Sequence, residues 1–366
     1  MVIGVLKSKN DTLVALVPKV ITKLINEEAQ ILIETEAGLK SNYKDSAYEE
    51  VGAKIVSRSE IFSDSDIILT FSDIEVEEVP LINKEAYLIG KFNTGIDSEL
   101  KTAFITNETN VFDLDLLPRS TIAQSMDVLS ALASLSGYKA VVLAADNYSG
   151  YFPMMTTSAG TVPPAKVMIL GAGVAGLQAI ATARRLGGSV EAFDVRSSVK
   201  EEVQSLGARF IEVEGAQEDT KAGGYAIEQS EEYIQKQKEL IHQTAIKADV
   251  VITSANIPNK KAPLLIEKRT IEQMKPGSVV IDMASATGGN VELSENNKSI
   301  EINGVRIIGD SRLFNQMGTQ ASHFYANNLY NFLKFTFKDG FAGIPYESEI
   351  VSKTLLQIKE KISTVN

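Results

Sequence analysis

Short apolar runs of strand length alternate with segments of helical periodicity along most of this 366-residue chain. In the first third, strands are predicted at residues 2–6, 31–33, 54–56, 67–70, 87–90 and 103–106, and helical segments include 18–28 and 98–102. In the second third, strands are predicted at 166–170, 189–193, 208–213, 249–254, 278–283 and 305–309. The near-continuous apolar character of these runs is typical of strands that are buried on both faces. The alternation therefore predicts an α/β fold built on doubly wound parallel sheets.

Two long segments rich in helix-forming residues, 121–145 and 313–334, interrupt this alternation. A chain of this length exceeds one ordinary core, so two domains are expected. We predict two Rossmann-like doubly wound domains that are joined by these long helices. The first contains residues 1–125 and 313–366, with 335–366 returning to pack on it, and the second contains residues 126–312.

The composition excludes several classes of protein. The net charge is −11, from 36 basic and 47 acidic residues, without a basic cluster that would favour nucleic acid. Cysteine is absent, which excludes disulfides, thiolate nucleophiles and the usual structural zinc sites. The apolar run at residues 2–6 is too short for a signal peptide, and no stretch of about 18 apolar residues is unbroken. These features predict a soluble, cytoplasmic chain without a membrane span.

A glycine-rich turn follows the strand predicted at 166–170. Gly171 permits a tight turn, Gly173 lets the backbone approach a pyrophosphate, and Gly176 lets the next helix pack close to the strand. The phosphates would then bind the free N–H groups at the helix N-terminus. The sequence of strand, turn and helix predicts a dinucleotide site.

An acidic residue, Asp194, ends the next predicted strand. A carboxylate at this place binds the adenosine ribose hydroxyls and repels a 2′-phosphate, so NAD(H) is favoured over NADP(H). Arg196 nearby weakens this exclusion of NADP(H) without reversing it. Residues 214–225 follow the third strand as a candidate lid, with Gly223 and Gly224 as a hinge and Tyr225 as a plug. The alternative is an acidic surface loop.

Only two histidines are present, His242 and His323, and we interpret both as structural or surface residues rather than catalytic bases. Dehydrogenases of alcohols or amines need such a base, because a proton leaves together with the hydride. Hydride exchange between two nicotinamide rings needs none. It needs positioning in a dry site, with the reacting carbons about 3–3.5 Å apart.

A polar cluster suited to holding a carboxamide lies at residues 119–130. A helix starting near residue 121 would place Gln124 and Asp127 on one face, and Arg119 could pair with Asp127. The alternative is a helix N-terminal cap with a solvated salt bridge.

This cluster belongs to a series of blocks that resembles the NAD(H)-binding component of proton-translocating NAD(P) transhydrogenase. The blocks, in order, are 118–119, 123–130, 137–141, 152–161, 193–196, 221–226, 276–284 and 288–290. The resemblance implies that Gln124 contacts the nicotinamide, that Arg119 and Asp127 hold this loop, and that Tyr225 on the mobile loop completes the catalytic group. It implies further NAD(H) contacts from Ser125, Met126, Asp127, Ser130, Val174, Asp194, Val195, Arg196, Gly224, Gln237 and Asn256, beside the three glycines of the turn.

Two positions depart from the family pattern: Asn256 replaces an expected apolar residue, and residues 284–287 lack an expected acid. The chain contains one nucleotide fingerprint, so the resemblance implies that NADP(H) is held by a partner subunit. It also implies membrane-spanning partners, a homodimer, and a cytoplasmic position peripheral to the inner membrane. The end of the chain at Asn366 fits a split arrangement of separate subunits.

Two alternative functions remain open. Alanine dehydrogenase resembles the chain in both domains but uses an Arg, a Lys and a His from its first domain, and none of the corresponding stretches, 11–16, 70–73 and 91–94, supplies the expected cation or base. A non-catalytic NAD-binding module shares the fold but predicts no hydride exchange with any partner.

Overall fold

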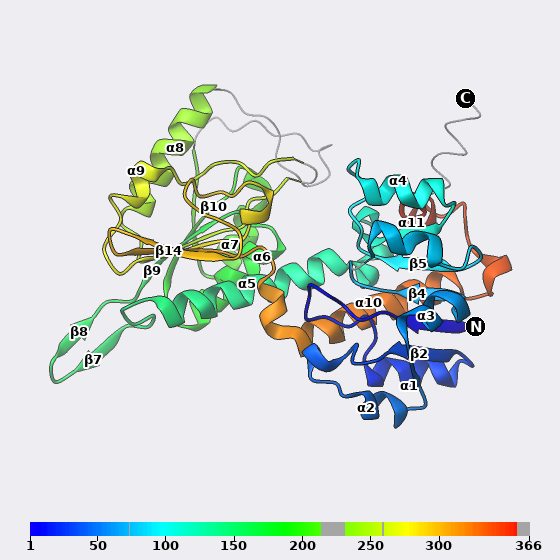
Figure 1. Ribbon diagram of the computed structural model, residues 1–366. Helices are drawn as coiled ribbons and strands as arrows, with labels where there is room; N and C mark the ends of the chain where they lie inside the picture. Colours follow the sequence, from blue (N-terminus) through cyan, green and yellow to red (C-terminus); the bar gives the residue numbers. More distant parts are fainter. Residues whose placement is uncertain (73, 214–230, 258–259, 357–366) are drawn as a thin grey trace. The chain divides into compact units, whose positions relative to one another are not determined.

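The chain folds into two compact units in the computed structural model, which describes residues 1–72, 74–213, 231–257 and 260–356 (Figure 1). Unit 1 contains Met1–Leu132 and Asn315–Asn366, and unit 2 contains Ala133–Phe314. The sequence-based prediction placed these boundaries after residues 125 and 312. Each unit is built on a sheet in which all or nearly all strand pairs are parallel, so the predicted α/β class is confirmed.

The sheet of unit 1 has six strands in the order β3-β2-β1-β4-β5-β6. All of its pairings are parallel, and β1 pairs with both β2 and β4. The strand order therefore reverses beside β1, which is the switch point of a doubly wound sheet. The strands are β1 Val2–Val5, β2 Gln30–Glu34, β3 Lys54–Val56, β4 Ile67–Leu69, β5 Tyr87–Gly90 and β6 Asn110–Asp113.

Helices and 3-10 turns connect these strands. A capping box starts α3, in which Ser57 accepts from the Glu60 backbone and the Glu60 side chain accepts from the Ser57 backbone. The helices are α1 Pro18–Asn26, α2 Asp45–Glu49, α3 Arg58–Asp64, α4 Glu99–Thr106, α10 Gly318–Thr336 and α11 Glu349–Thr354. The 3-10 turns are η1 Leu39–Ser41, η2 Val76–Leu81, η3 Leu114–Leu116, η4 Ala123–Met126 and η8 Phe341–Gly343.

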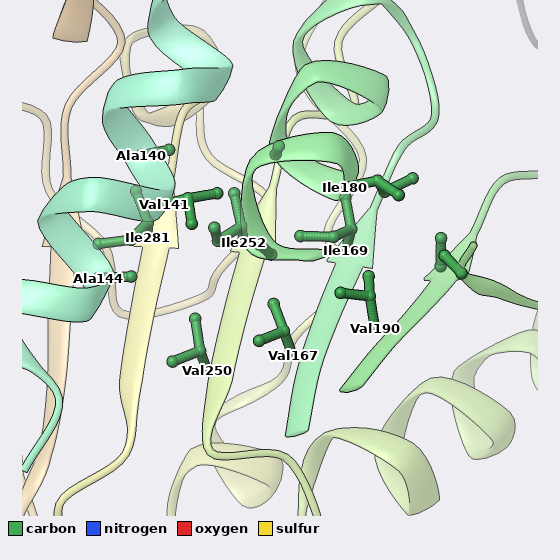
Figure 2. Close-up of a cluster of buried hydrophobic side chains, with 14 of the residues drawn as sticks. Ala140, Val141, Ala144, Val167, Ile169, Ile180, Val190, Val250, Ile252 and Ile281 are labelled. Atoms are coloured by element: carbon green, nitrogen blue, oxygen red, sulfur yellow. The ribbon is translucent and has the colours of Figure 1, made fainter. Parts of the chain in front are cut away.

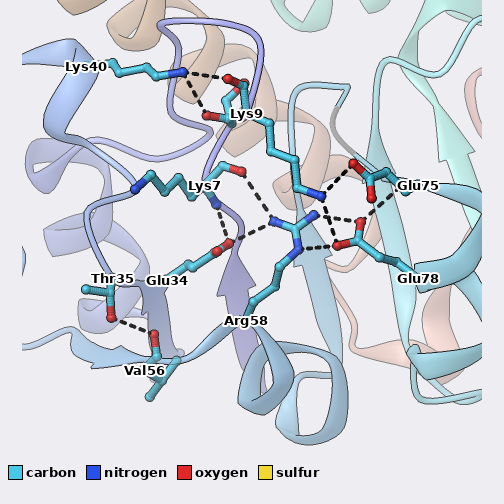
Figure 3. Close-up of polar contacts among 10 residues, drawn as sticks. Lys7, Lys9, Glu34, Thr35, Lys40, Val56, Arg58, Glu75 and Glu78 are labelled. Carbon is cyan, nitrogen blue, oxygen red and sulfur yellow. Dashed lines mark hydrogen bonds and ion pairs between the residues drawn. The ribbon is translucent and has the colours of Figure 1, made fainter.

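An ion-pair network, here called the Arg58 network, lies beyond the carboxyl ends of β1 and β2 (Figure 3). Arg58 pairs with Glu34 at 3.0 Å through Nη1 and with Glu78 at 2.8 Å through Nε. Lys9 pairs with Glu75 at 2.9 Å and with Glu78 at 3.3 Å. The side chains of Arg58, Glu34 and Glu78 are largely buried. The network fixes the loop that follows β1.

The sheet of unit 2 has seven strands in the order β11-β10-β9-β12-β13-β15-β14. Only β14 is antiparallel to its neighbour in this sheet, and the order reverses beside β9. The strands are β9 Lys166–Leu170, β10 Ser189–Phe193, β11 Arg209–Ile211, β12 Val250–Thr253, β13 Val279–Asp282, β14 Lys298–Ile302 and β15 Val305–Gly309. A separate hairpin of β7 Met155–Thr157 and β8 Gly160–Val162 extends from this unit.

Helices cover both faces of this second sheet. On one face, Ala140, Val141 and Ala144 of α5 point toward Ile252 and Ile281 of the sheet, and all five are fully buried (Figure 2). The opposite face is covered by α8, whose Ile241 and Ala245 are buried against it. The elements are α5 Val128–Asn147, α6 Val174–Arg185, η5 Ser197–Val199, α7 Lys200–Ser205, α8 Glu231–Ala245, α9 Lys268–Ile271, η6 Ser285–Thr287 and η7 Leu313–Met317.

Three local predictions were wrong. Residues 103–106 belong to α4 rather than to a strand, and the strand lies at β6, because the apolar run at 103–106 packs through Phe104 as one face of a helix. The helix predicted over 121–145 is interrupted: η4 ends at Met126, Asp127 is extended, and α5 begins at Val128. The prediction that residues 313–334 form a second bridging helix is also wrong. The helix α10 lies wholly within unit 1, and the chain passes from one unit to the other at η7.

One helix in the described part of the chain, α5, is long and apolar enough to cross a membrane, with a mean hydropathy of 1.6 over 18 residues. This differs from the prediction from the sequence, which contains no unbroken apolar stretch of about 18 residues. Burial explains much of its composition, because 44% of that window is buried and its alanine and valine face belongs to the core of unit 2. Length and composition alone are weak evidence for a span.

Candidate nucleotide-binding site

The glycine turn lies between β9 and α6, at the carboxyl end of the strand where the order of the sheet reverses. Gly171 has φ +97°, a left-handed conformation that favours glycine. A Cβ on Gly176 would clash with the carbonyl oxygen of Gly171, so the close packing of α6 on the strand requires glycine there. A Cβ on Gly173 would meet no atom within 4 Å. The exposed backbone at Gly173 therefore leaves room for a ligand.

Neighbouring elements brace this turn. The Oγ of Ser254, which follows β12, donates to the carbonyl of Gly171 at 3.2 Å. Gly137 of α5 packs so closely on α6 that a Cβ would clash with the carbonyl of Ala175. Gly173 is the N-cap of α6 and supplies no side chain, so no side chain caps the first N–H groups of the helix, which begin at Val174. This is an anion-binding geometry.

Asp194 follows β10 and is tied to the same turn. Its Oδ2 accepts from the backbone N–H of Ala172 at 2.7 Å. Its Oδ1 accepts from the backbone N–H and the Nε of Arg196, both at 2.9 Å, and the Nη2 of Arg196 donates to Oδ2 at 2.8 Å. The hydrogen bond and charge of Asp194 raise the pKa of Arg196. Asp194, the acid predicted to select NAD(H), is thus held beside the turn. Val195, which lies between Asp194 and Arg196 in the sequence, is half-buried.

Polar contacts also join the loops that follow β12 and β13. Asp282, fully buried, accepts from Thr253 Oγ1 at 3.1 Å, from the backbone N–H groups of Ala284 and Asn290, and from the Ser294 hydroxyl. The Nδ2 of Asn290 donates to the carbonyls of Ala255 and Pro263, both at 2.8 Å. In the sequence, Asp282 and Asn290 stand out only as members of the matching blocks, although an acid at the end of a buried strand is a signal for such a role.

Both departures from the family pattern meet in this region. The Oγ1 of Thr287 donates to the Oδ1 of Asn256 at 3.3 Å and to the carbonyl of Ala284 at 2.9 Å. A polar residue at 256 therefore has a hydrogen-bond partner in the segment that lacks the expected acid.

The remaining predicted contacts of unit 2 are Gln237, Gly224 and Tyr225. Gln237 lies half-buried on α8, while Gly224 and Tyr225 lie outside the described residues. His242 is buried on α8 and its Nδ1 hydrogen-bonds Thr270 Oγ1 at 2.9 Å, in keeping with a structural role. A hollow of about 340 Å³ lies instead beside Lys166 and Ser189, at the opposite, amino-terminal edge of the sheet.

The predicted nicotinamide segment belongs to unit 1. Gln124 and Ser125 are exposed, Arg119 is exposed before them, and Met126 is buried. The predicted common helical face of Gln124 and Asp127 was wrong, because Asp127 stands outside η4 in an extended conformation. Asp127 instead caps α5: its Oδ1 accepts from the Ser130 backbone N–H at 2.9 Å, and its Oδ2 accepts from the Ser130 hydroxyl at 2.6 Å. The pairing of Arg119 with Asp127 stays a prediction.

Comparison with known proteins gives two family matches. Residues 6–136 match the model "Alanine dehydrogenase/PNT, N-terminal domain", and residues 140–364 match "Alanine dehydrogenase/PNT, C-terminal domain".

Individual relatives are similar over nearly the whole chain. An NAD(P) transhydrogenase subunit alpha from Haemophilus influenzae is 40% identical over 356 residues, which are 96% of this chain and 69% of that protein. A Rickettsia prowazekii protein named as the first part of NAD(P) transhydrogenase subunit alpha is 41% identical over 91% of this chain and 88% of its own. A crystal structure of transhydrogenase from Sinorhizobium meliloti superposes with a TM-score of 0.88, at 39% identity over 97% of this chain and 98% of that one. The chain belongs to the alanine dehydrogenase/PNT family, and within it to the group of NAD(P) transhydrogenase alpha subunits.

Proposed function

We propose that this chain binds NAD(H) in unit 2 and presents it for direct hydride exchange with NADP⁺ held on a partner subunit. The observation that carries this proposal is the combination of the glycine turn with Asp194 at the switch point of the sheet. The relatives named NAD(P) transhydrogenase subunit alpha support the reaction. Their names also imply further subunits.

The residues around the turn fit a dinucleotide. The open space at Gly173 and the uncapped N–H groups that begin at Val174 suit the pyrophosphate. The carboxylate of Asp194 suits the adenosine ribose hydroxyls and repels a 2′-phosphate, with Val195 and Arg196 beside it. Gln237, Asn256 and, outside the described residues, Gly224 and Tyr225 are proposed as further contacts.

Catalysis in this proposal comes from positioning. Bound NADH supplies a hydride, which passes to NADP⁺ to give NAD⁺ and NADPH, so no proton is taken up or released at the ring carbons. Gln124 orients the nicotinamide carboxamide, with Ser125, Met126 and Ser130 around it. Asp127 acts through Ser130 by fixing the start of α5, and Arg119 holds the preceding loop.

The amino-acid dehydrogenase alternative finds little support in unit 1. The carboxylate of Asp11 is buried and accepts from Asn315 Nδ2 at 2.8 Å and from Ser72 Oγ at 3.3 Å. Lys91 pairs with Asp115 at 3.1 Å. These groups are engaged within the unit, so they are not poised for a substrate.

The partners proposed for this chain are an NADP(H)-binding subunit and a membrane-spanning subunit, with a second copy of the chain forming a homodimer. A relative named as the first part of an alpha subunit supports a split arrangement. The chain would then lie on the cytoplasmic side of the inner membrane, attached through its partners.

A mixing experiment tests the function. The chain alone should bind NADH, shown by a change in nucleotide fluorescence, without oxidising it in the presence of pyruvate plus ammonia or of NADP⁺. With an NADP(H)-binding transhydrogenase component, it should transfer hydride between NADH and an NADP⁺ analogue. Tight NADH binding without transfer would favour the non-catalytic module, and pyruvate-dependent oxidation with ammonia would favour the dehydrogenase.

Gln124 can be tested separately from the phosphate contacts. Gln124→Asn should leave the dissociation constant of NADH within a few-fold while transfer falls by about 10², since a 1 Å misplacement costs roughly this factor. The exposed neighbour Thr121 supplies a control, and Thr121→Ser should change neither quantity. Equal losses in binding and transfer would show that Gln124 is structural.

A further inference from the structure

Two asparagines on α10 hold the turn that carries Gln124. The Nδ2 of Asn328 donates to the carbonyl oxygen of Ser125 at 2.9 Å, and the Nδ2 of Asn331 donates to the same oxygen, also at 2.9 Å. The two residues are three positions apart, so both project from one face of the helix. Both lone pairs of a single carbonyl are thereby used.

The helix that presents this asparagine pair is itself firmly anchored in unit 1. The hydroxyl of Tyr325, fully buried, donates to the carbonyl of Thr70 at 2.6 Å, beyond the end of β4. Ser322 accepts from the backbone N–H of Val14 at 3.0 Å. The asparagine pair therefore fixes the position of the Ser125 carbonyl relative to the sheet.

The two end residues of η4 are buried and its two middle residues are exposed, which makes this anchor important. Ala123 and Met126 are buried, whereas Gln124 and Ser125 are exposed. Packing thus holds the two ends of the turn, but no burial orients the Gln124 side chain. The asparagine pair fixes the Ser125–Met126 peptide plane, one residue beyond Gln124.

We propose that Asn328 and Asn331 are positioning residues for hydride transfer, which set the geometry of Gln124 through the Ser125 carbonyl. The proposal rests on the function proposed above. In it, neither asparagine touches the nucleotide. A shift of Gln124 by about 1 Å on loss of the pair would slow transfer by roughly 10².

The unpaired acceptor atom of Asn328 allows its positioning role to be tested separately from any effect on stability. The residue is 9% exposed, and its Oδ1 is buried without a hydrogen-bond partner in the described part of the chain. An unpaired buried acceptor is unfavourable, and Asn328→Leu removes it while the Ser125 carbonyl keeps its hydrogen bond from Asn331. Asn328→Leu should therefore retain or raise the unfolding temperature while slowing transfer.

The experiment compares Asn328→Leu, Asn331→Ala and the double variant with wild type, using the full chain and an NADP(H)-binding partner. Each single variant should slow single-turnover transfer about tenfold and the double variant about 10². The NADH dissociation constant should stay within about threefold, because the phosphate contacts lie elsewhere. Asn331→Asp should be slower than Asn331→Ala, since its carboxylate repels the Ser125 carbonyl.

Asn327 on the same helix is the matched control. Its Nδ2 donates at 2.7 Å to the carbonyl of His323, one turn earlier, so Asn327→Ala should leave transfer unchanged. A folded double variant with wild-type transfer, or losses in transfer matched by losses in NADH binding, would overturn the positioning role alone. Failure of the wild-type chain to transfer hydride, with a partner that works with a relative's alpha subunit, would overturn the proposed function and this role together.

Discussion

The loop after β1 in unit 1 and the turn after β9 in unit 2 occupy the same place in their sheets. In both, a backbone N–H two residues beyond the strand donates at 2.7 Å to an acid at the end of the neighbouring strand: Lys7 to Glu34 in unit 1, and Ala172 to Asp194 in unit 2. Both acids also pair with an arginine, Arg58 at 3.0 Å and Arg196 at 2.8 Å.

The segment that leads from the strand to the next helix differs between the two units. In unit 2, α6 begins at Val174, so its N-terminus lies directly behind the glycine turn. In unit 1, α1 begins only at Pro18, and the intervening loop is fixed by the Arg58 network (Figure 3) and by Asn315, which accepts from the Thr12 backbone at 3.1 Å. Unit 1 therefore fills its switch point with its own side chains.

Strand order and a well-placed acid therefore do not by themselves make a nucleotide site. A phosphate needs backbone that approaches closely and free N–H groups. Unit 1 offers carboxylates at this place, from Glu34, Glu75 and Glu78, which repel phosphate. Four experiments test this contrast.

The largest effect is expected from Gly176→Ala. The added Cβ would collide with the backbone carbonyl of Gly171, so α6 must move away from the strand. We expect NADH affinity to fall by more than 10² and the free energy of unfolding to fall by about 1–3 kcal/mol, as for overpacked interiors. NADH fluorescence titration and urea denaturation measure the two quantities. Unchanged binding would remove the turn from the proposed site.

The two acids provide a matched pair of isosteric changes. Asp194→Asn should weaken NADH binding by about tenfold or more, because a charge-assisted hydrogen bond contributes about 1.5–3 kcal/mol. It should also reduce the preference for NADH over NADPH, since the repelling charge is gone. Glu34→Gln should leave NADH binding unchanged and lower stability, because the guanidinium of Arg58 loses a charged partner. Equal effects on binding would mean that the two acids are not functionally distinct.

Gly173→Ala isolates the approach of backbone to phosphate. Space around this position is open, so stability should not change. NADH binding should weaken by about tenfold, equivalent to about 1.4 kcal/mol, if the pyrophosphate lies against Gly173. Calorimetric titration of folded protein is the measurement. Retained affinity would indicate that the phosphates lie elsewhere on the turn.

The smallest effect concerns the pH dependence of unit 1. Burial raises the pKa of Glu78, but hydrogen bonds from Arg58 and the Glu75 backbone, together with the charge of Arg58, lower it below the ordinary value of 4.5. Its stabilising contribution is therefore present above about pH 4.5 and is lost as pH falls through the lowered pKa. Glu78→Gln should flatten acid unfolding in that window, followed by circular dichroism. Glu50→Gln, at an exposed position, is the control.

The sequence alone determined the features that depend on neighbouring residues. The bounds of β9 and β10 were predicted without error, because continuous buried strands differ clearly from the polar turns around them. The glycine turn was also readable, since steric freedom at Gly171 and Gly176 is a property of single residues. Asp194 followed from its place at the end of a strand. These local rules sufficed for the fold class and for one half of the candidate site.

The way in which the other half is held depends on contacts between elements that are distant in the sequence. Helical periodicity continued through Asp127, and nothing local indicated that the helix would break there to be capped by that residue. The contacts of Ser125 with Asn328 and Asn331 join residues 203 and 206 positions apart. Likewise, the loop that fills the switch point of unit 1 is held by Asn315, which is 303 positions from its partner Thr12. Such contacts arise when separate elements pack together, so their partners cannot be read from spacing along the chain.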